Sequence, residues 1–117
     1  MESLFLPDKK RSAYVFQTFL YASIVCRKLR EKGSDLRVAP SLLYIHRAAA
    51  EDYSPVVQLK ESYNKTTPVE DFSLLEEEFR TRLQALLEEI FNPDLSFSQT
   101  EEEDRCTYCD FKEICKR

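Results

Sequence analysis

Apolar residues dominate one long stretch of the chain, residues 13–32, which holds neither proline nor glycine. Ser12 precedes the stretch as a good N-cap, and Gly33, the sole glycine, follows it where a left-handed C-cap is favoured. The pattern predicts a helix over residues 12–33. Its first five turns are apolar on nearly every side, which is typical of a helix buried between layers. We therefore expect it to be the central helix of the fold.

Shorter apolar runs follow within residues 36–60. The second half of the segment Leu36–His46 is typical of a short buried strand, and Pro55–Lys60 is a second candidate. The polar segment 64–68 then predicts a turn, because it combines asparagine, threonine and proline. The sequence thus predicts two short strands after the central helix.

A second helix is predicted over residues 73–92. Ser73 and Glu76 match a capping box, in which the two side chains satisfy each other's backbone donors. Apolar residues then recur at helical spacing and make the helix amphipathic: Leu75, Phe79, Leu83, Leu86, Leu87 and Ile90. Pro93 ends the helix, and an acidic connector leads to a cysteine-rich tail over residues 105–117.

Composition places the chain among ordinary soluble globular proteins. Its 117 residues suit one domain, which we expect to span residues 1–117, with 43% hydrophobic and 32% charged residues. The net charge of -4 gives no general attraction to nucleic acid or anionic lipid, and one glycine is too few for a phosphate-binding loop. No apolar run reaches transmembrane length and the N-terminus lacks the features of a signal peptide. We expect a cytoplasmic protein without a membrane partner.

Three of the four cysteines lie in the tail with the spacing C-x2-C-x5-C: Cys106, Cys109 and Cys115. This spacing can turn the thiolates toward one centre, as in zinc and iron–sulfur sites. Such sites usually take four protein ligands, and the tail supplies three. Alternatively, the cysteines are buried in the core as small hydrophobic residues, or two of them form a disulfide in an oxidising compartment. For an intracellular chain, metal or cluster ligation is the favoured interpretation.

Two polar residues of the first predicted helix, Gln17 and Tyr21, are four apart and hence on one face. Either the two residues act together as a functional pair, or Gln17 lies at the edge of the helix and faces water. His46, at the end of a predicted strand, has no acidic or nucleophilic neighbour in the sequence. We expect His46 to be an ordinary boundary residue rather than a ligand or base.

These signals come in an order that resembles a known family. A Q-x-x-x-Y helix (residues 17–21), two strands, a long helix and the C-x2-C-x5-C tail (residues 106–115) resemble the C-terminal half of RecB-type and AddB-type nuclease domains of the PD-(D/E)XK superfamily. The resemblance extends over the whole chain and implies a partial restriction-endonuclease-like fold of the α/β (α+β) class. It also implies a subunit of a DNA exonuclease or helicase–nuclease in repair and recombination, with DNA and a helicase subunit or domain as partners.

In that family, an acidic residue on one strand and an Asp/Glu-x-Lys on the next bind magnesium or manganese, which activates a water molecule. Upstream of Gln17, the segment 7–10 is too close and wrongly spaced to supply these residues. We therefore expect the chain to be inactive alone and to be an expressed fragment or a truncated gene product. By resemblance, Gln17 and Tyr21 lie beside the metal site and help to place the DNA strand. Three basic residues complete the candidate DNA contacts: Lys9, Lys10 and Arg11.

By the same resemblance, the tail cysteines anchor a 4Fe-4S cluster whose first cysteine comes from well upstream, so the cluster is expected to be absent from this chain alone. Cys26 is a poor fourth ligand because it lies on the buried helix. The main alternative is a small zinc-stabilised protein-interaction domain, in which Cys26 or His46 completes the site and the amphipathic helix docks a partner. A further alternative is a structural helical protein with incidental cysteines.

Overall fold

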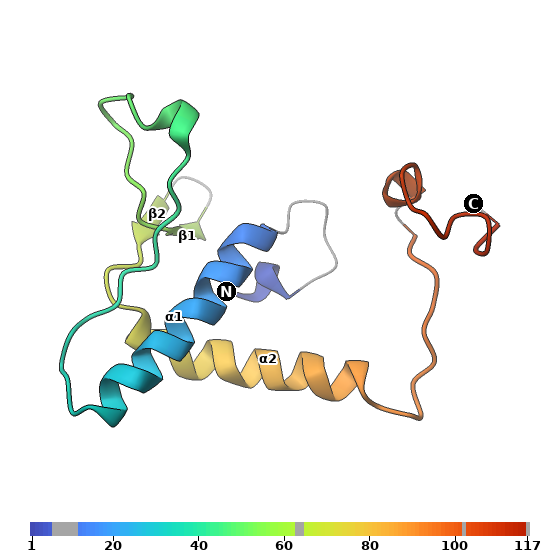
Figure 1. Cartoon of the computed structure of the whole chain (residues 1–117), viewed down its shortest axis with the longest axis horizontal. Coiled ribbons are helices and arrows are strands. Elements are labelled where there is room, and N and C mark those ends of the chain that lie inside the picture. The colour runs from blue at the N-terminus through green and yellow to red at the C-terminus, as the bar shows by residue number, and fades with distance from the viewer. Residues whose placement is uncertain (6–11, 63–64, 102, 117) are drawn as a thin grey trace. The chain divides into compact units, whose positions relative to one another are not determined.

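The computed structural model describes residues 1–5, 12–62, 65–101 and 103–116 (Figure 1). The chain divides into two compact units, Met1–Leu87 and Glu88–Arg117. The first unit combines helices with a small antiparallel sheet, which confirms the mixed α+β class. That residues 1–117 form one domain stays a prediction.

Helix α1 spans Ala13–Glu31 (Figure 1). The Ser12 hydroxyl accepts a hydrogen bond from the Val15 N–H at 3.3 Å, so the predicted N-cap is confirmed. Gly33 has a φ of 64° just after the C-cap residue, which confirms the predicted left-handed stop. Local signals therefore set both ends of the helix.

Only one face of α1 is buried. Its core side holds three buried residues: Phe19, Ala22 and Cys26. The opposite side carries four large exposed residues: Tyr14, Tyr21, Ile24 and Val25. The prediction of a helix buried on nearly every side is therefore wrong for the residues that the structure describes. The physical reason is that the core forms on the side of Phe19 and Cys26, which leaves Tyr14 and Tyr21 more than half exposed in the described structure.

An aromatic cluster forms the core of the first unit. Phe19, Phe72 and Phe79 have no exposed surface. The ring of Phe79 lies 5.9 Å from Phe19 and 5.8 Å from Phe72, and Phe19 lies 5.1 Å from Phe72, all in tilted or edge-on geometry. Phe5 and Phe16 complete the contacts of Phe79 at 5.5 and 5.7 Å. The cluster thus joins both helices to the N-terminal segment.

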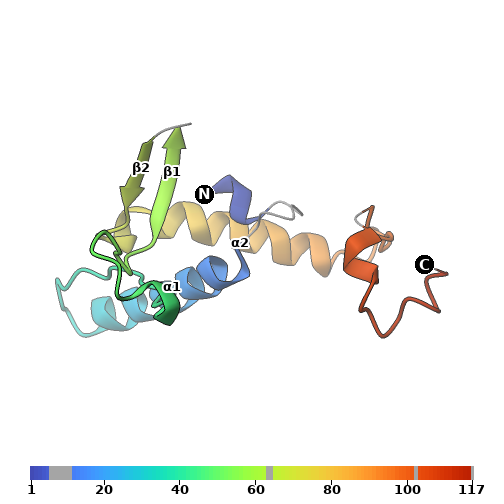
Figure 2. The same ribbon diagram turned by 90° about the horizontal axis from the view of Figure 1, so that it is seen from above.

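Strands β1 (Gln58–Ser62) and β2 (Lys65–Pro68) form an antiparallel hairpin, which Figure 2 shows as a two-stranded ribbon. Gln58 lies opposite Pro68, and the Thr66 hydroxyl donates to the Gln58 side-chain oxygen at 2.9 Å. The predicted strand Pro55–Lys60 is therefore confirmed only in its last residues. The turn predicted for residues 64–68 is wrong where β2 forms, because cross-strand pairing outweighs the turn propensity of that segment.

Residues 40–57 form a projecting arm between α1 and β1 (Figure 1). Its two sides are joined at the base, where the Val57 N–H donates to the Pro40 carbonyl at 2.9 Å and the Leu42 N–H to the Pro55 carbonyl at 2.7 Å. The strand predicted near residues 42–46 is wrong, since Ile45–Arg47 is a turn of 3-10 helix. Ile45 is 85% exposed, so this apolar run has no sheet to bury it.

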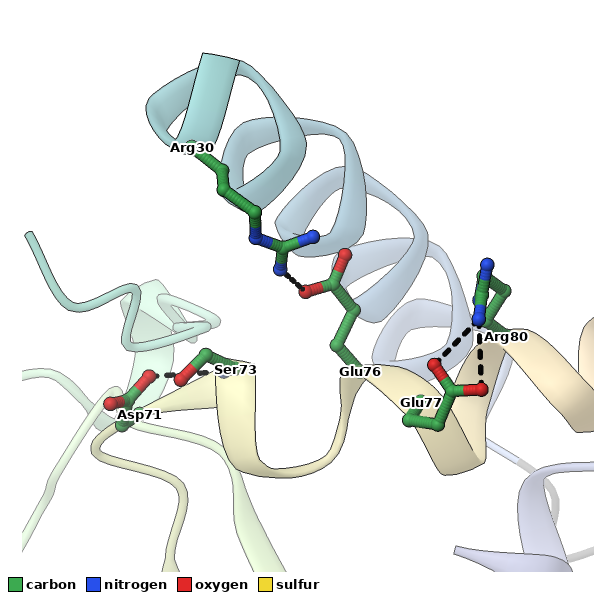
Figure 3. A network of polar contacts seen from close by, with 6 residues as sticks. All are labelled: Arg30, Asp71, Ser73, Glu76, Glu77 and Arg80. Atoms are coloured by element: carbon green, nitrogen blue, oxygen red, sulfur yellow. Dashed lines mark hydrogen bonds and ion pairs between the residues drawn. The ribbon is translucent and has the colours of Figure 1, made fainter. Parts of the chain in front are cut away.

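Helix α2 spans Glu76–Ile90 and follows a 3-10 turn, Phe72–Leu74. The Ser73 N–H donates to the Asp71 carboxylate at 3.0 Å, so Asp71 caps this turn. The capping box predicted from Ser73 and Glu76 is wrong, because the Glu76 carboxylate instead pairs with Arg30 of α1 (Figure 3). The long amphipathic helix itself is confirmed.

The second unit has little regular structure in its described residues. After α2, residues 91–101 contain no helix or strand, and Glu103–Cys106 form a 3-10 turn. Successive turns continue through the tail: the Cys109 N–H donates to the Cys106 carbonyl and the Cys115 N–H to the Phe111 carbonyl, each at 3.2 Å. Local turns rather than a packed core therefore organise this segment.

Candidate functional site

The best-defined polar pair predicted from the sequence lies on the exposed face of α1. The Gln17 side-chain N–H donates to the Tyr21 hydroxyl oxygen at 3.1 Å. Tyr21 is 57% exposed, and Gln17 is exposed as well. The predicted shared face is confirmed. The role of the two residues in placing DNA stays a prediction.

The chemistry of this pair suits a polar ligand. Gln17 keeps its amide oxygen as an acceptor and a second N–H as a donor, while the Tyr21 hydroxyl keeps its own hydrogen. Three apolar or aromatic residues of the same helix are also exposed: Tyr14, Ile24 and Val25. An amide and a phenol set in an apolar surface can bind a partner's polar groups and exclude water around them.

Charged side chains form ion pairs and hydrogen bonds where α2 begins (Figure 3). Arg30 of α1 pairs with Glu76, whose side chain is only 14% exposed. Arg80 pairs with Glu77 at 2.6 Å on the helix surface. Hydrogen bonds from the Ser73 hydroxyl and N–H hold the pKa of Asp71 below its ordinary value. Each of these carboxylates has a partner within the fold, and the Arg30–Glu76 pair joins α1 to α2.

Cys26 is 6% exposed and packs in the core of the first unit. Burial raises the pKa of its thiol above the ordinary value, and the carboxylates of Glu76 and Asp71 raise it further, partly offset by Arg30. The thiolate is the form that attacks or ligates. Cys26 is therefore poorly suited to either task, as expected from its place on the helix.

All four cysteines are free thiols. The three tail cysteines are half-buried, and their neighbours Tyr108 and Ile114 are exposed. Within the described ranges, no three or more His, Cys, Asp or Glu side chains are grouped so as to hold a metal ion. In the part of the chain that the structure describes, these side chains therefore form no preformed magnesium, manganese, zinc or iron–sulfur site.

The remaining candidates from the sequence are His46 and three basic residues near the N-terminus. His46 is exposed on the arm, and its ring lies 6.1 Å from the Tyr44 ring, centroid to centroid, at an interplanar angle of 68°. It therefore adds no support to the zinc alternative. Lys9, Lys10 and Arg11 lie outside the described residues, so their predicted DNA contacts stay predictions. Of the helices that the structure describes, none is long and apolar enough to cross a membrane.

One feature was missed by the sequence analysis. The arm and the start of α1 line a cavity of about 300 Å³, and Tyr53 ties the arm together beside it. The Tyr53 hydroxyl donates to the Leu42 carbonyl at 2.6 Å and accepts from the Tyr44 N–H at 2.7 Å. Two tyrosines on either side of an alanine-rich tip are the only local signal for this arrangement.

The fold by itself defines a small α+β domain, and comparison with protein families is more specific. The chain matches the PD-(D/E)XK nuclease superfamily over residues 6–116 and belongs to that superfamily. Its elements are consistent with a partial restriction-endonuclease-like fold. The class has nuclease-type function, acts on DNA and typically uses magnesium or manganese. In the same comparisons, no curated protein and no solved structure matches this chain.

Proposed function

We propose that this chain is the C-terminal part of the nuclease domain of a RecB-type or AddB-type protein. The whole protein is a metal-dependent DNA exonuclease or the subunit of a helicase–nuclease. It is cytoplasmic and acts in repair and recombination. The chain's own task is to position DNA. The catalytic Asp and Asp/Glu-x-Lys come from strands outside the described residues, and a helicase subunit or domain is the partner.

The observation that carries this proposal is the Gln17–Tyr21 pair. The side chains are joined at 3.1 Å on the surface of α1, and both are exposed. An exposed amide donates to phosphate or sugar oxygens, and a tyrosine ring or hydroxyl adds stacking or a further hydrogen bond. The pair therefore supports a role in placing a DNA strand.

The sequences of the two described strands support an accessory role for this part of the domain. Strand β1 reads Gln-Leu-Lys-Glu-Ser and β2 reads Lys-Thr-Thr-Pro, and neither contains Asp/Glu-x-Lys. Metal-assisted hydrolysis needs carboxylates that converge on the ion. These two strands therefore support an accessory rather than a catalytic role for this part of the domain.

The test compares two proteins, the 117-residue chain and the chain extended by the coding sequence upstream of Met1. Each is incubated with linear single- and double-stranded DNA and with magnesium or manganese. The extended protein should degrade DNA and the chain alone should leave it intact. Metal-dependent degradation by the clean chain, or none by an extended protein that carries the acidic motifs, contradicts the proposal.

We also propose that Cys106, Cys109 and Cys115 ligate a 4Fe-4S cluster together with a cysteine supplied by the extended protein. The C-x2-C-x5-C spacing and the three free thiols support this assignment. Iron and sulfide assays on anaerobically purified proteins should find the cluster in the extended protein and not in the chain alone. Cys109→Ser should abolish it, whereas Cys26→Ala should not. Stoichiometric zinc in the chain alone would favour the zinc-stabilised interaction domain.

A further inference from the structure

The cavity beside the arm has the size of a small-molecule site. Its volume is about 300 Å³. This is the lower end of the range of about 300–1,000 Å³ found for ligand pockets. Such a cavity admits one nucleotide unit, whereas a docked helix or several residues of a peptide need a longer groove. Its lining includes Tyr44, Arg47, Asp52 and Tyr53 of the arm, Val15 of α1 and Gln58 of β1.

Three side chains of the cavity offer complementary chemistry. Tyr44 is 40% exposed, so part of its ring is open to stacking. Arg47 and Asp52 are exposed, and neither forms a salt bridge with another residue in the described part of the chain. A guanidinium is suited to phosphate oxygens, and a carboxylate accepts hydrogen bonds from the N–H groups of a base. An aromatic face, a cation and an acceptor are the groups that recognise a nucleotide.

The backbone around Tyr44 is held in place rather than loose. The Tyr53 hydroxyl is bonded to the Tyr44 N–H at 2.7 Å and to the Leu42 carbonyl at 2.6 Å. The base of the arm is closed by the isolated bridge between Ser41 and Val56. Because Tyr53 links both sides of the arm, it fixes the backbone that carries the Tyr44 ring. Preorganisation of this kind lowers the entropic cost of binding.

We propose that this cavity binds a single unpaired nucleotide of the DNA strand, a role that rests on the proposed nuclease function and extends it. The base stacks on Tyr44, the Arg47 guanidinium binds the adjoining phosphate, and the Asp52 carboxylate accepts hydrogen bonds from base N–H groups. Guanine presents two such groups side by side on its pairing edge, and thymine presents one. The cavity therefore binds single-stranded DNA and favours guanine over thymine.

The experiment measures binding of the 117-residue chain to a fluorescent oligothymidylate and to the same strand with one central guanine, without divalent metal. Tyr44→Ala should weaken binding about tenfold, as expected for the loss of one stacked base. Arg47→Ala should weaken binding to both strands and lower the slope of affinity against salt by about one. Asp52→Asn should reduce the preference for the guanine strand. Tyr53→Phe should weaken binding without removing a group that touches DNA.

Matched controls separate the cavity from general surface effects. Arg37→Ala removes an exposed arginine outside the cavity, and Tyr108→Ala removes an exposed tyrosine of the other unit. Both should bind as the unmodified chain does. Melting curves identify variants that fail to fold. If Tyr44→Ala is among them, Tyr44→Leu keeps apolar volume without the ring and should bind weakly, whereas Tyr44→Phe should bind normally.

Several outcomes overturn the inference. The first is that the chain binds no oligonucleotide. The second is that folded Tyr44 and Arg47 variants bind as tightly as the unmodified chain. The third is that Arg37→Ala and Arg47→Ala lower the affinity for DNA by the same factor. Variants that bind DNA normally but lose association with a helicase subunit would assign the cavity to a protein partner instead. The outcomes with variants leave the proposed nuclease function untouched, because its test is DNA cleavage by the unmodified extended protein. Absence of binding by the unmodified chain would also contradict the proposed task of positioning DNA, whereas the cleavage test would still stand by itself.

Discussion

Replacing Tyr21 by phenylalanine removes one oxygen atom and tests whether the exposed pair on α1 serves function or stability. The lost bond is the 3.1 Å contact from the Gln17 amide, in a pair that is exposed to water. Such side-chain bonds between residues four apart on a helix contribute about 0.2–0.5 kcal/mol. For a unit of this size, the melting temperature should therefore fall by less than about 4 °C.

The expected effect on catalysis is larger. A hydrogen bond to a charged group such as a DNA phosphate contributes about 1.5–3 kcal/mol. Its loss in the transition state lowers turnover by roughly tenfold to a hundredfold. Melting is followed by circular dichroism on the chain, and turnover is measured per folded molecule of the extended protein. Gln17→Ala should behave in the same way.

Tyr14→Phe is the matched control, since Tyr14 is an exposed tyrosine of the same helix and keeps its backbone bond from Thr18. It should change neither melting nor turnover. The reasoning is refuted if Tyr21→Phe lowers the melting temperature sharply while activity per folded molecule is unchanged. In that case Tyr21 stabilises the fold, and its assignment to DNA placement fails.

Three further changes probe the packing and the titration of the first unit. Phe79→Ala should lower the free energy of unfolding by about 3–5 kcal/mol in urea titrations, because it opens a cavity among four aromatic rings; a loss below about 1 kcal/mol contradicts this packing. Asp71→Ala should lower the melting temperature, whereas Asp71→Asn keeps an acceptor for the Ser73 N–H and should not. Cys26 should react with a thiol reagent more slowly than the tail cysteines until urea exposes it. Because its pKa is raised in the folded state, stability should fall as pH rises above about 8.5, and Cys26→Ala should remove that part of the fall.

Much of the helical structure could be predicted because its signals are local. Ser12 and Gly33 mark the ends of α1 within a turn, and the spacing of four that joins Gln17 to Tyr21 needs no tertiary information. Burial is different, because it depends on what packs against a helix. An apolar sequence on all sides predicted burial, yet Tyr21 is 57% exposed.

The strands and the arm could not be predicted well for the same reason. The segment Lys65–Pro68 is polar and typical of a turn, and only its pairing with β1 makes it a strand. The apolar run at Ile45 is typical of a buried strand, but short apolar runs do not specify one conformation. The cavity was missed because Val15, Tyr44 and Gln58 converge on it from distant parts of the sequence.

The hairpin β1–β2 also bears on how the protein behaves in concentrated solution. In the described residues it is a sheet of two strands only, so each strand has an outer edge with backbone groups that no third strand pairs. Open edges are templates for pairing between molecules. Lys60 lies on one strand and Lys65 on the other, and both are exposed. Because like charges repel, these lysines oppose edge-to-edge association of two hairpins. The hairpin therefore contributes to the solubility of the chain as well as to its fold.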